Sequence, residues 1–174
     1  MSVTKITGLT YSLATAVNSV FAKQCRVYVA KGSLASGDIP ATTTELAALY
    51  DETGDFVFLG NLSESGSKLG WKQNSIAIDF GSVPTSTDVT GTLISLMCDE
   101  EMLGFIEEQI GEHTFLFVPD KGDGKIFCAL SGVTIAHEGE IPIVGKSDSA
   151  KITLTLTANV NKVTDAVKFK KLTT

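Results

Sequence analysis

The side chains best suited to nucleophilic or metal chemistry are three cysteines and two histidines. Cys25, Cys98 and Cys128 form no C-x-x-C pair, and each lies in or beside an apolar run, so we expect reduced, buried thiols. His113 and His137 are too few for a three-histidine metal site, and neither has a second ligand at helical i, i+4 spacing. The sequence therefore predicts no catalytic, metal-binding or cofactor-binding residue.

Two glycine-containing segments resemble ligand-binding loops but lack residues that those loops need. Residues 145–147 (GKS) match the end of a phosphate-binding loop, which requires a glycine five residues earlier, where this chain has Glu140. Residues 120–124 (DKGDG) resemble the start of a calcium loop, but the third and fifth positions are glycine and the twelfth is Ser131. Both segments are better explained as turns between strands, and we expect no enzyme.

The composition favours a single β-rich domain over residues 1–174. Valine, isoleucine and threonine account for 46 of the 174 residues, and these stiff side chains suit pleated sheets. The formal charge of −6 argues against a protein that grips nucleic acid through clustered lysine and arginine. No apolar run approaches the roughly 18 residues of a membrane span, and no secretory leader is evident. We expect a soluble protein made in the cytoplasm, with no membrane partner.

Short apolar runs between clusters of glycine, serine, proline and aspartate predict strands. The runs cover residues 25–30, 56–59, 75–80 and 89–97. In the third run (SIAIDF), Ile76, Ile78 and Phe80 share one face, which predicts that this face lies on the core.

The second half of the chain carries the clearest strand signals. Residues 114–118 and 125–130 predict a hairpin, because the turn between them holds glycines that can adopt a positive φ. Residues 151–160 alternate between apolar side chains and threonine or asparagine over ten positions, which predicts a long strand with one buried face.

One helix is expected over residues 100–110, with Asp99 as its N-cap and Gly111 as its stop. Its outer face would carry Glu107 and Glu108, which either meet water, dock a basic partner or repel nucleic acid. A shorter helical turn is expected at residues 43–50, whereas residues 10–24 suit helix and strand equally.

Residues 60–75 (GNLSESGSKLGWKQNS) look too polar for a core and predict a long loop. The loop holds Trp71, the only tryptophan, which either folds back onto the domain or anchors a protein interface.

The order of elements from about residue 75 to residue 160 resembles that of the tail tube proteins of tailed bacteriophages. The pattern consists of the strands SIAIDFG and VTGTLISLM, the acidic helix DEEMLGFIEEQIG, the hairpin TFLFVPD/KIFCALSGV, the turn-rich EGEIPIVGKSDS and the closing strand AKITLTLTANV. The resemblance implies a β-sandwich or β-barrel with one flanking helix and long loops. It also implies a homohexamer without cofactor, whose stacked rings form the conduit for DNA ejection.

The same resemblance implies a virion protein whose partners are its own copies, other tail proteins, and double-stranded DNA that passes the lumen without specific binding. The 60–75 loop would reach neighbouring subunits, which makes Ser63, Glu64, Lys68 and Trp71 the candidate subunit contacts. Residues 1–10 and 162–174 would form a flexible arm and tail. The alternatives are a tail terminator, a head–tail joining protein, a contractile inner tube, or a soluble β-sandwich binding module.

Overall fold

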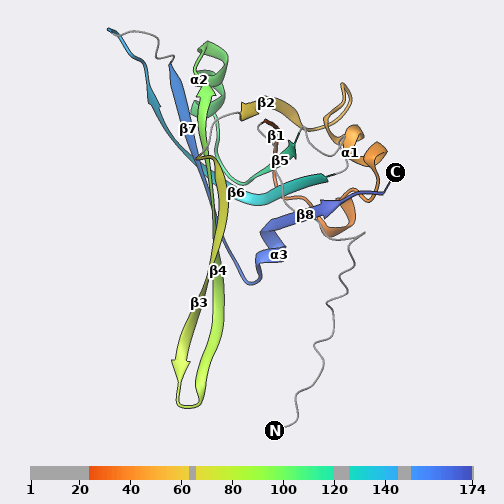
Figure 1. Cartoon of the computed structure of the whole chain (residues 1–174), viewed down its shortest axis with the longest axis vertical. Coiled ribbons are helices and arrows are strands. Elements are labelled where there is room, and N and C mark those ends of the chain that lie inside the picture. The colour runs from red at the N-terminus through yellow and green to blue at the C-terminus, as the bar shows by residue number, and fades with distance from the viewer. Residues whose placement is uncertain (1–23, 63–65, 120–125, 145–149, 174) are drawn as a thin grey trace.

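The computed structural model describes residues 24–62, 66–119, 126–144 and 150–173 (Figure 1). These residues form eight strands, three α-helices and one 3-10 turn, which confirms the mainly β class. The elements are β1 (Cys25–Lys31), η1 (Ser36–Asp38), α1 (Thr43–Tyr50), β2 (Val57–Leu62), β3 (Lys68–Ile78), β4 (Gly81–Met97), α2 (Glu100–Glu107), β5 (His113–Pro119), β6 (Ile126–Glu140), β7 (Lys151–Val160), α3 (Val163–Ala166) and β8 (Val167–Lys171).

The strands form an antiparallel sheet in the order β2-β1-β5-β6-β7-β4-β3, with β8 paired to β6 beside this path. The long strand β6 links the two halves of the sheet. Its first part pairs with β5 and β8, and its second part, from Thr134 to Glu140, pairs with β7. Gly132, with φ +70°, lies between these parts, where the pairing with β5 shifts register. Only glycine adopts this backbone conformation without strain.

The main core lies between the two halves of the sheet. Val27 and Phe115 from one half pack in the same cluster as Leu93 and Leu154 from the other, and α2 adds Met102 and Ile106. Alternate residues of β1 and β5 point to the opposite face, where Tyr28, Leu116 and Phe127 form a second cluster with Leu46 of α1. Strand β5 is therefore buried on both faces, and the halves form a sandwich.

The strongest sequence predictions are confirmed. Strand β7 buries Ile152, Leu154 and Leu156, while the threonines between them are half-buried or exposed. The hairpin partners β5 and β6 pair antiparallel, as expected. The α2 helix begins where predicted, because the Asp99 Oδ1 atom accepts a 2.8 Å hydrogen bond from the Met102 amide. It ends at Glu107, one turn earlier than the predicted Ile110.

The remaining local predictions have mixed outcomes. The predicted helical turn at 43–50 is α1, whose Thr42 and Glu45 form a capping box. All three cysteines are reduced thiols; Cys25 and Cys128 are buried, whereas Cys98 is only half-buried. Burial raises the pKa of the Cys128 thiol to about 12, with the nearby Cys25 thiol adding to the effect.

Two predictions of irregular chain are wrong. Most of the predicted 60–75 loop is strand, since β2 continues to Leu62 and β3 begins at Lys68. The predicted C-terminal tail, 162–174, forms α3 and β8, because Ala166 and Leu172 are buried and the β8 backbone pairs with β6. The arm at residues 1–10, the ambiguous segment up to residue 23, and the turns at 120–124 and 145–147 lie outside the described residues.

Candidate assembly surface

The most distinctive surface is a long hairpin of β3 and β4 that extends away from the core (Figure 1). The two strands pair from Lys68 with Thr92 to Ile78 with Gly81. Strand β7 supports β4 only from Thr87 onward. The outer part, residues 75–86, is therefore two-stranded, and we call it the distal hairpin.

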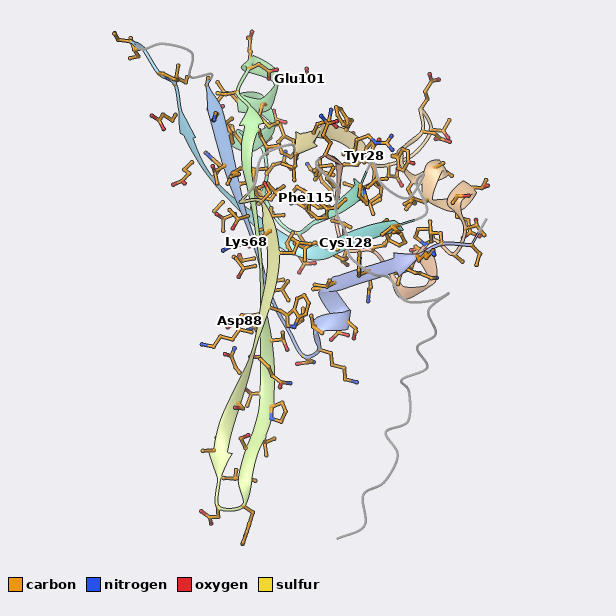
Figure 2. All side chains as sticks on the ribbon, viewed as in Figure 1. Tyr28, Lys68, Asp88, Glu101, Phe115 and Cys128 are labelled. Carbon is orange, nitrogen blue, oxygen red and sulfur yellow. The ribbon has the colours of Figure 1, made fainter. Side chains whose placement is uncertain are left out.

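The distal hairpin exposes apolar side chains on the outer part of the molecule. Ile76 is 61% exposed, Ile78 54%, Phe80 99% and Val83 46%. Ile76 lies directly opposite Val83 in the strand register, so their side chains share a face. The prediction that Ile76, Ile78 and Phe80 face the core is wrong, because no other described element covers this part of the hairpin (Figure 2).

A polar cluster fixes the hairpin at its base, where β3, β4 and β7 meet. The Asp88 carboxylate accepts a 2.7 Å hydrogen bond from the Asn74 amide and a second one from the Asn159 amide. Asn74 also donates to the Ser86 hydroxyl. These hydrogen bonds, that of Asn74 first, hold the pKa of Asp88 below its usual value. The cluster ties three strands together and orients the distal hairpin.

Two of the predicted contact residues lie on the same hairpin. Trp71 is 60% exposed, so most of its ring does not pack in the core, although Val89, its partner on the neighbouring strand, is buried there. Lys68 is exposed at the start of β3. Ser63 and Glu64 lie outside the described residues. The structure therefore places Trp71 and Lys68 on a strand rather than on the loop that the sequence predicted.

The opposite end of the molecule carries a second exposed group of side chains. Glu107 and Glu108 are exposed at the end of α2, far from the distal hairpin (Figure 1). Beyond β6 at the same end, Ile143 is 93% exposed and Val144 94%. The sequence pattern predicted a strand at residues 141–144, which is wrong, because β6 ends at Glu140 and these residues lie beyond it. The run of Ile, Pro, Ile and Val between two strands was a usable signal, since turns are normally polar.

This arrangement is suited to binding protein. Within the described residues, His, Cys, Asp and Glu side chains form no group of three that could hold a metal ion. The helices described in the structure are too short or too polar to cross a membrane. Exposed apolar groups at both ends of a small domain are typical of interaction sites.

Comparison of the chain with protein-family models and with curated protein sequences finds no match.

Proposed function

We propose that this protein is a structural subunit of a bacteriophage tail tube, which assembles as stacked hexameric rings and carries DNA into the host. The distal hairpin is the observation that supports the proposal most directly. A two-stranded hairpin is marginally stable alone in water, and this one exposes Ile76, Ile78 and Phe80. Contact with another copy would cover these side chains and give the extension a purpose.

The sheet also leaves two edges available for contacts between copies. Strands β2 and β3 are the ends of the strand order, so each has one side without a strand partner among the described residues. Open edges tend to pair with other chains. Heterologous contacts between unlike surfaces close into rings when the rotation permits. Stacking would then bring the distal hairpin of one ring to the end of the next that carries Ile143 and Val144.

The charge of the chain suits a conduit. A formal charge of −6 per subunit disfavours the release of counterions from DNA that makes nucleic-acid binding strong. DNA could therefore pass without being retained. In this proposal the protein is made in the host cytoplasm, becomes part of the virion tail, and contacts other tail proteins at the tube ends.

A contractile inner tube is the second candidate, and the acidic end of α2 favours it. Glu107 and Glu108 are exposed and could dock a basic sheath protein. The tail terminator and head–tail joining protein would use the same domain without extended stacking.

Negative-stain electron microscopy of the purified protein, with sedimentation velocity over a range of concentrations, tests the proposal. Tubes or six-fold rings are the expected result. Single rings that never stack would favour a terminator or joining protein. A monomer of about 18 kDa at high concentration would refute the tube and favour a soluble β-sandwich binding module.

A further inference from the structure

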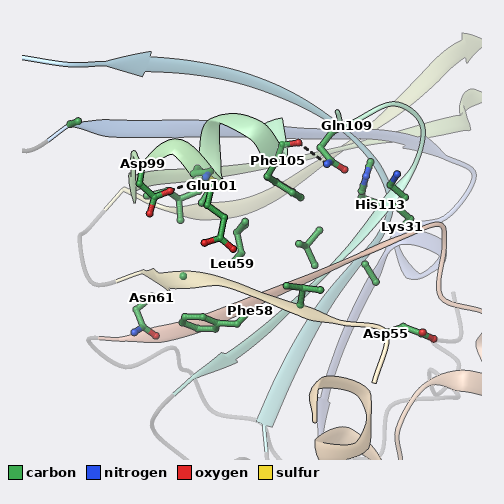
Figure 3. Close-up of a pocket in the computed structure, with 17 residues that line it drawn as sticks. Lys31, Asp55, Phe58, Leu59, Asn61, Asp99, Glu101, Phe105, Gln109 and His113 are labelled. Atoms are coloured by element: carbon green, nitrogen blue, oxygen red, sulfur yellow. Dashed lines mark hydrogen bonds between the residues drawn. The ribbon is translucent and has the colours of Figure 1, made fainter. Parts of the chain in front are cut away.

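A groove separates α2 from the edge strand β2 (Figure 3). Val57 and Leu59 line it on the β2 side, and Phe105 lines it on the α2 side. Phe58 only borders the groove, because it lies opposite Tyr28 and meets the Tyr28 ring edge-on at 5.5 Å on the other face of the sheet. Val57 is 68% exposed, although it belongs to a strand of the sandwich. The groove thus presents apolar surface that no described segment covers.

Two kinds of polar group beside the groove can take a further partner. Strand β2 pairs with β1 on one side only, so the backbone groups on its other side can pair with an added segment. His113 lines the same groove and is 1% exposed, yet neither of its ring nitrogens has a hydrogen-bond partner in the described chain. Burial lowers the pKa of His113, and the Gly111 backbone opposes this shift only in part. Burial thus favours the neutral form of the ring, which has one donor and one acceptor to offer.

The charge of the groove identifies a fitting occupant. Its lining carries three carboxylates, those of Asp55, Asp99 and Glu101, and one lysine, Lys31, for a net charge of −2. An occupant should be apolar and basic. The distal hairpin does not fit, since its only charged residue is acidic, Asp79.

Residues 1–23 have the required character, because they contain Lys5 and Lys23, no acidic residue, and many apolar side chains. They also join the described fold at the right place. Cys25 pairs with Leu62, next to Asn61, which lines one end of the groove. A chain of 23 residues can span up to about 75 Å, several times the length of β2.

We propose that the groove between α2 and β2 is the binding site for residues 1–23 of this chain. Apolar side chains of the segment would cover Leu59 and Phe105, its lysines would face the acidic rim, and its backbone would pair with β2. This inference goes beyond the proposed function, because it does not depend on rings or tubes.

Site-specific photocrosslinking in the full-length protein tests the proposal. A benzophenone amino acid replaces Val57, which lines the groove and is 68% exposed, and in the control it replaces Ala47, which is exposed on α1. After irradiation, mass spectrometry should find the Val57 position joined to a peptide within residues 1–23, and the Ala47 position not. Crosslinks from the groove to other segments only, or no crosslinks, would overturn the proposal.

A charge exchange supplies an independent test. Reversal of both lysines, K5E with K23E, should lower the crosslink yield about fivefold, as expected for loss of exposed ion pairs. The second change E101K should restore much of the yield. Equal melting temperatures for all variants will show that folding is intact. If neither the lysine reversal nor E101K changes the crosslink yield, the role of charge is refuted, and with it the choice of residues 1–23 as the occupant.

The gel mobility of the crosslinked product shows whether the segment occupies the groove of its own chain or that of a second copy. Either outcome supports the site. If the protein crosslinks but stays strictly monomeric, this inference holds and the tube is refuted. If the protein forms tubes but gives no crosslink, the tube holds and this inference is refuted.

Discussion

Removal of the apolar side chains from the distal hairpin should abolish assembly without destabilising the fold. The variant replaces Ile76, Ile78 and Phe80 by threonine, which keeps a good strand former at the two β3 positions and a small polar residue in the turn at position 80. In the isolated subunit these side chains are mostly in water, so their loss should change the free energy of unfolding by less than about 0.5 kcal/mol. For a domain of this length the melting temperature should move by no more than about 2 °C.

The effect on assembly should be much larger. The exposed fractions of the three side chains, 61%, 54% and 99%, together equal about two whole side chains. Burial of one whole apolar side chain contributes about 1.5–3 kcal/mol, so burial of the equivalent of two would contribute about 3–6 kcal/mol per subunit. Because each 1.4 kcal/mol is a factor of ten, the association constant should fall by about 10² to 10⁴.

Sedimentation velocity and negative-stain microscopy measure association, and circular dichroism measures the melting temperature. Ile110→Thr is the matched control, because Ile110 is 88% exposed beyond α2 and lies outside the hairpin. The control should assemble normally. If the triple variant assembles as well as the wild type, or if its melting temperature falls by 5 °C or more (about 1 kcal/mol or more), the hairpin is not an assembly contact.

Three further predictions concern the fold itself. Gly91→Ala should destabilise the protein by about 1–3 kcal/mol, since an added Cβ would lie 2.9–3.3 Å from three leucine side chains. Gly70→Ala is the control and should be neutral or slightly stabilising, because the space around Gly70 is open. Equal denaturation midpoints for the two variants would contradict this prediction. In the native protein at pH 8, Cys98 should react with a thiol reagent while Cys128 stays protected until unfolding, and rapid labelling of Cys128 would refute its burial. Asp88→Ala should lower the free energy of unfolding at pH 7. The difference from the wild type should vanish as the pH falls below 3.8, the ordinary carboxyl pKa, and then through the lower pKa that Asp88 has in the folded protein. A difference in stability that persists at pH 2 would show that the carboxylate is not responsible.

The parts of the fold that the sequence predicted are those whose pattern has a single physical cause. Strand β7 has one face on the core and one toward solvent, so its apolar residues alternate with threonine over ten positions. The start of α2 was predictable because an N-cap aspartate makes a local hydrogen bond that depends on no distant residue. The β5–β6 hairpin was predictable because glycines lie between its two apolar runs.

The hairpin of β3 and β4 was missed because solvent reaches both of its faces. Residues 68–75 are polar for this reason and looked like a loop, and Pro84 made the start of β4 look like a turn. Alternation correctly placed Ile76 and Ile78 on one side of β3, whereas Phe80 lies in the turn beyond that strand, and alternation cannot show what covers a face. The groove was missed because it depends on how α2 lies beside β2, which no local pattern shows. Asp99 and Glu101 had a sufficient local explanation at the N-terminus of the helix.

The shared strand β6 gives the subunit its mechanical character. Strand β6 hydrogen-bonds with β5 and β8 along one part and with β7 along the other. The two layers therefore cannot separate unless backbone hydrogen bonds of β6 break. Gly132 lies between the two paired parts of β6, and a side chain there would cost roughly 1 kcal/mol or more in backbone strain. A force that separates the two layers would therefore act along β6 itself, and the distal hairpin transmits force to β6 through β7.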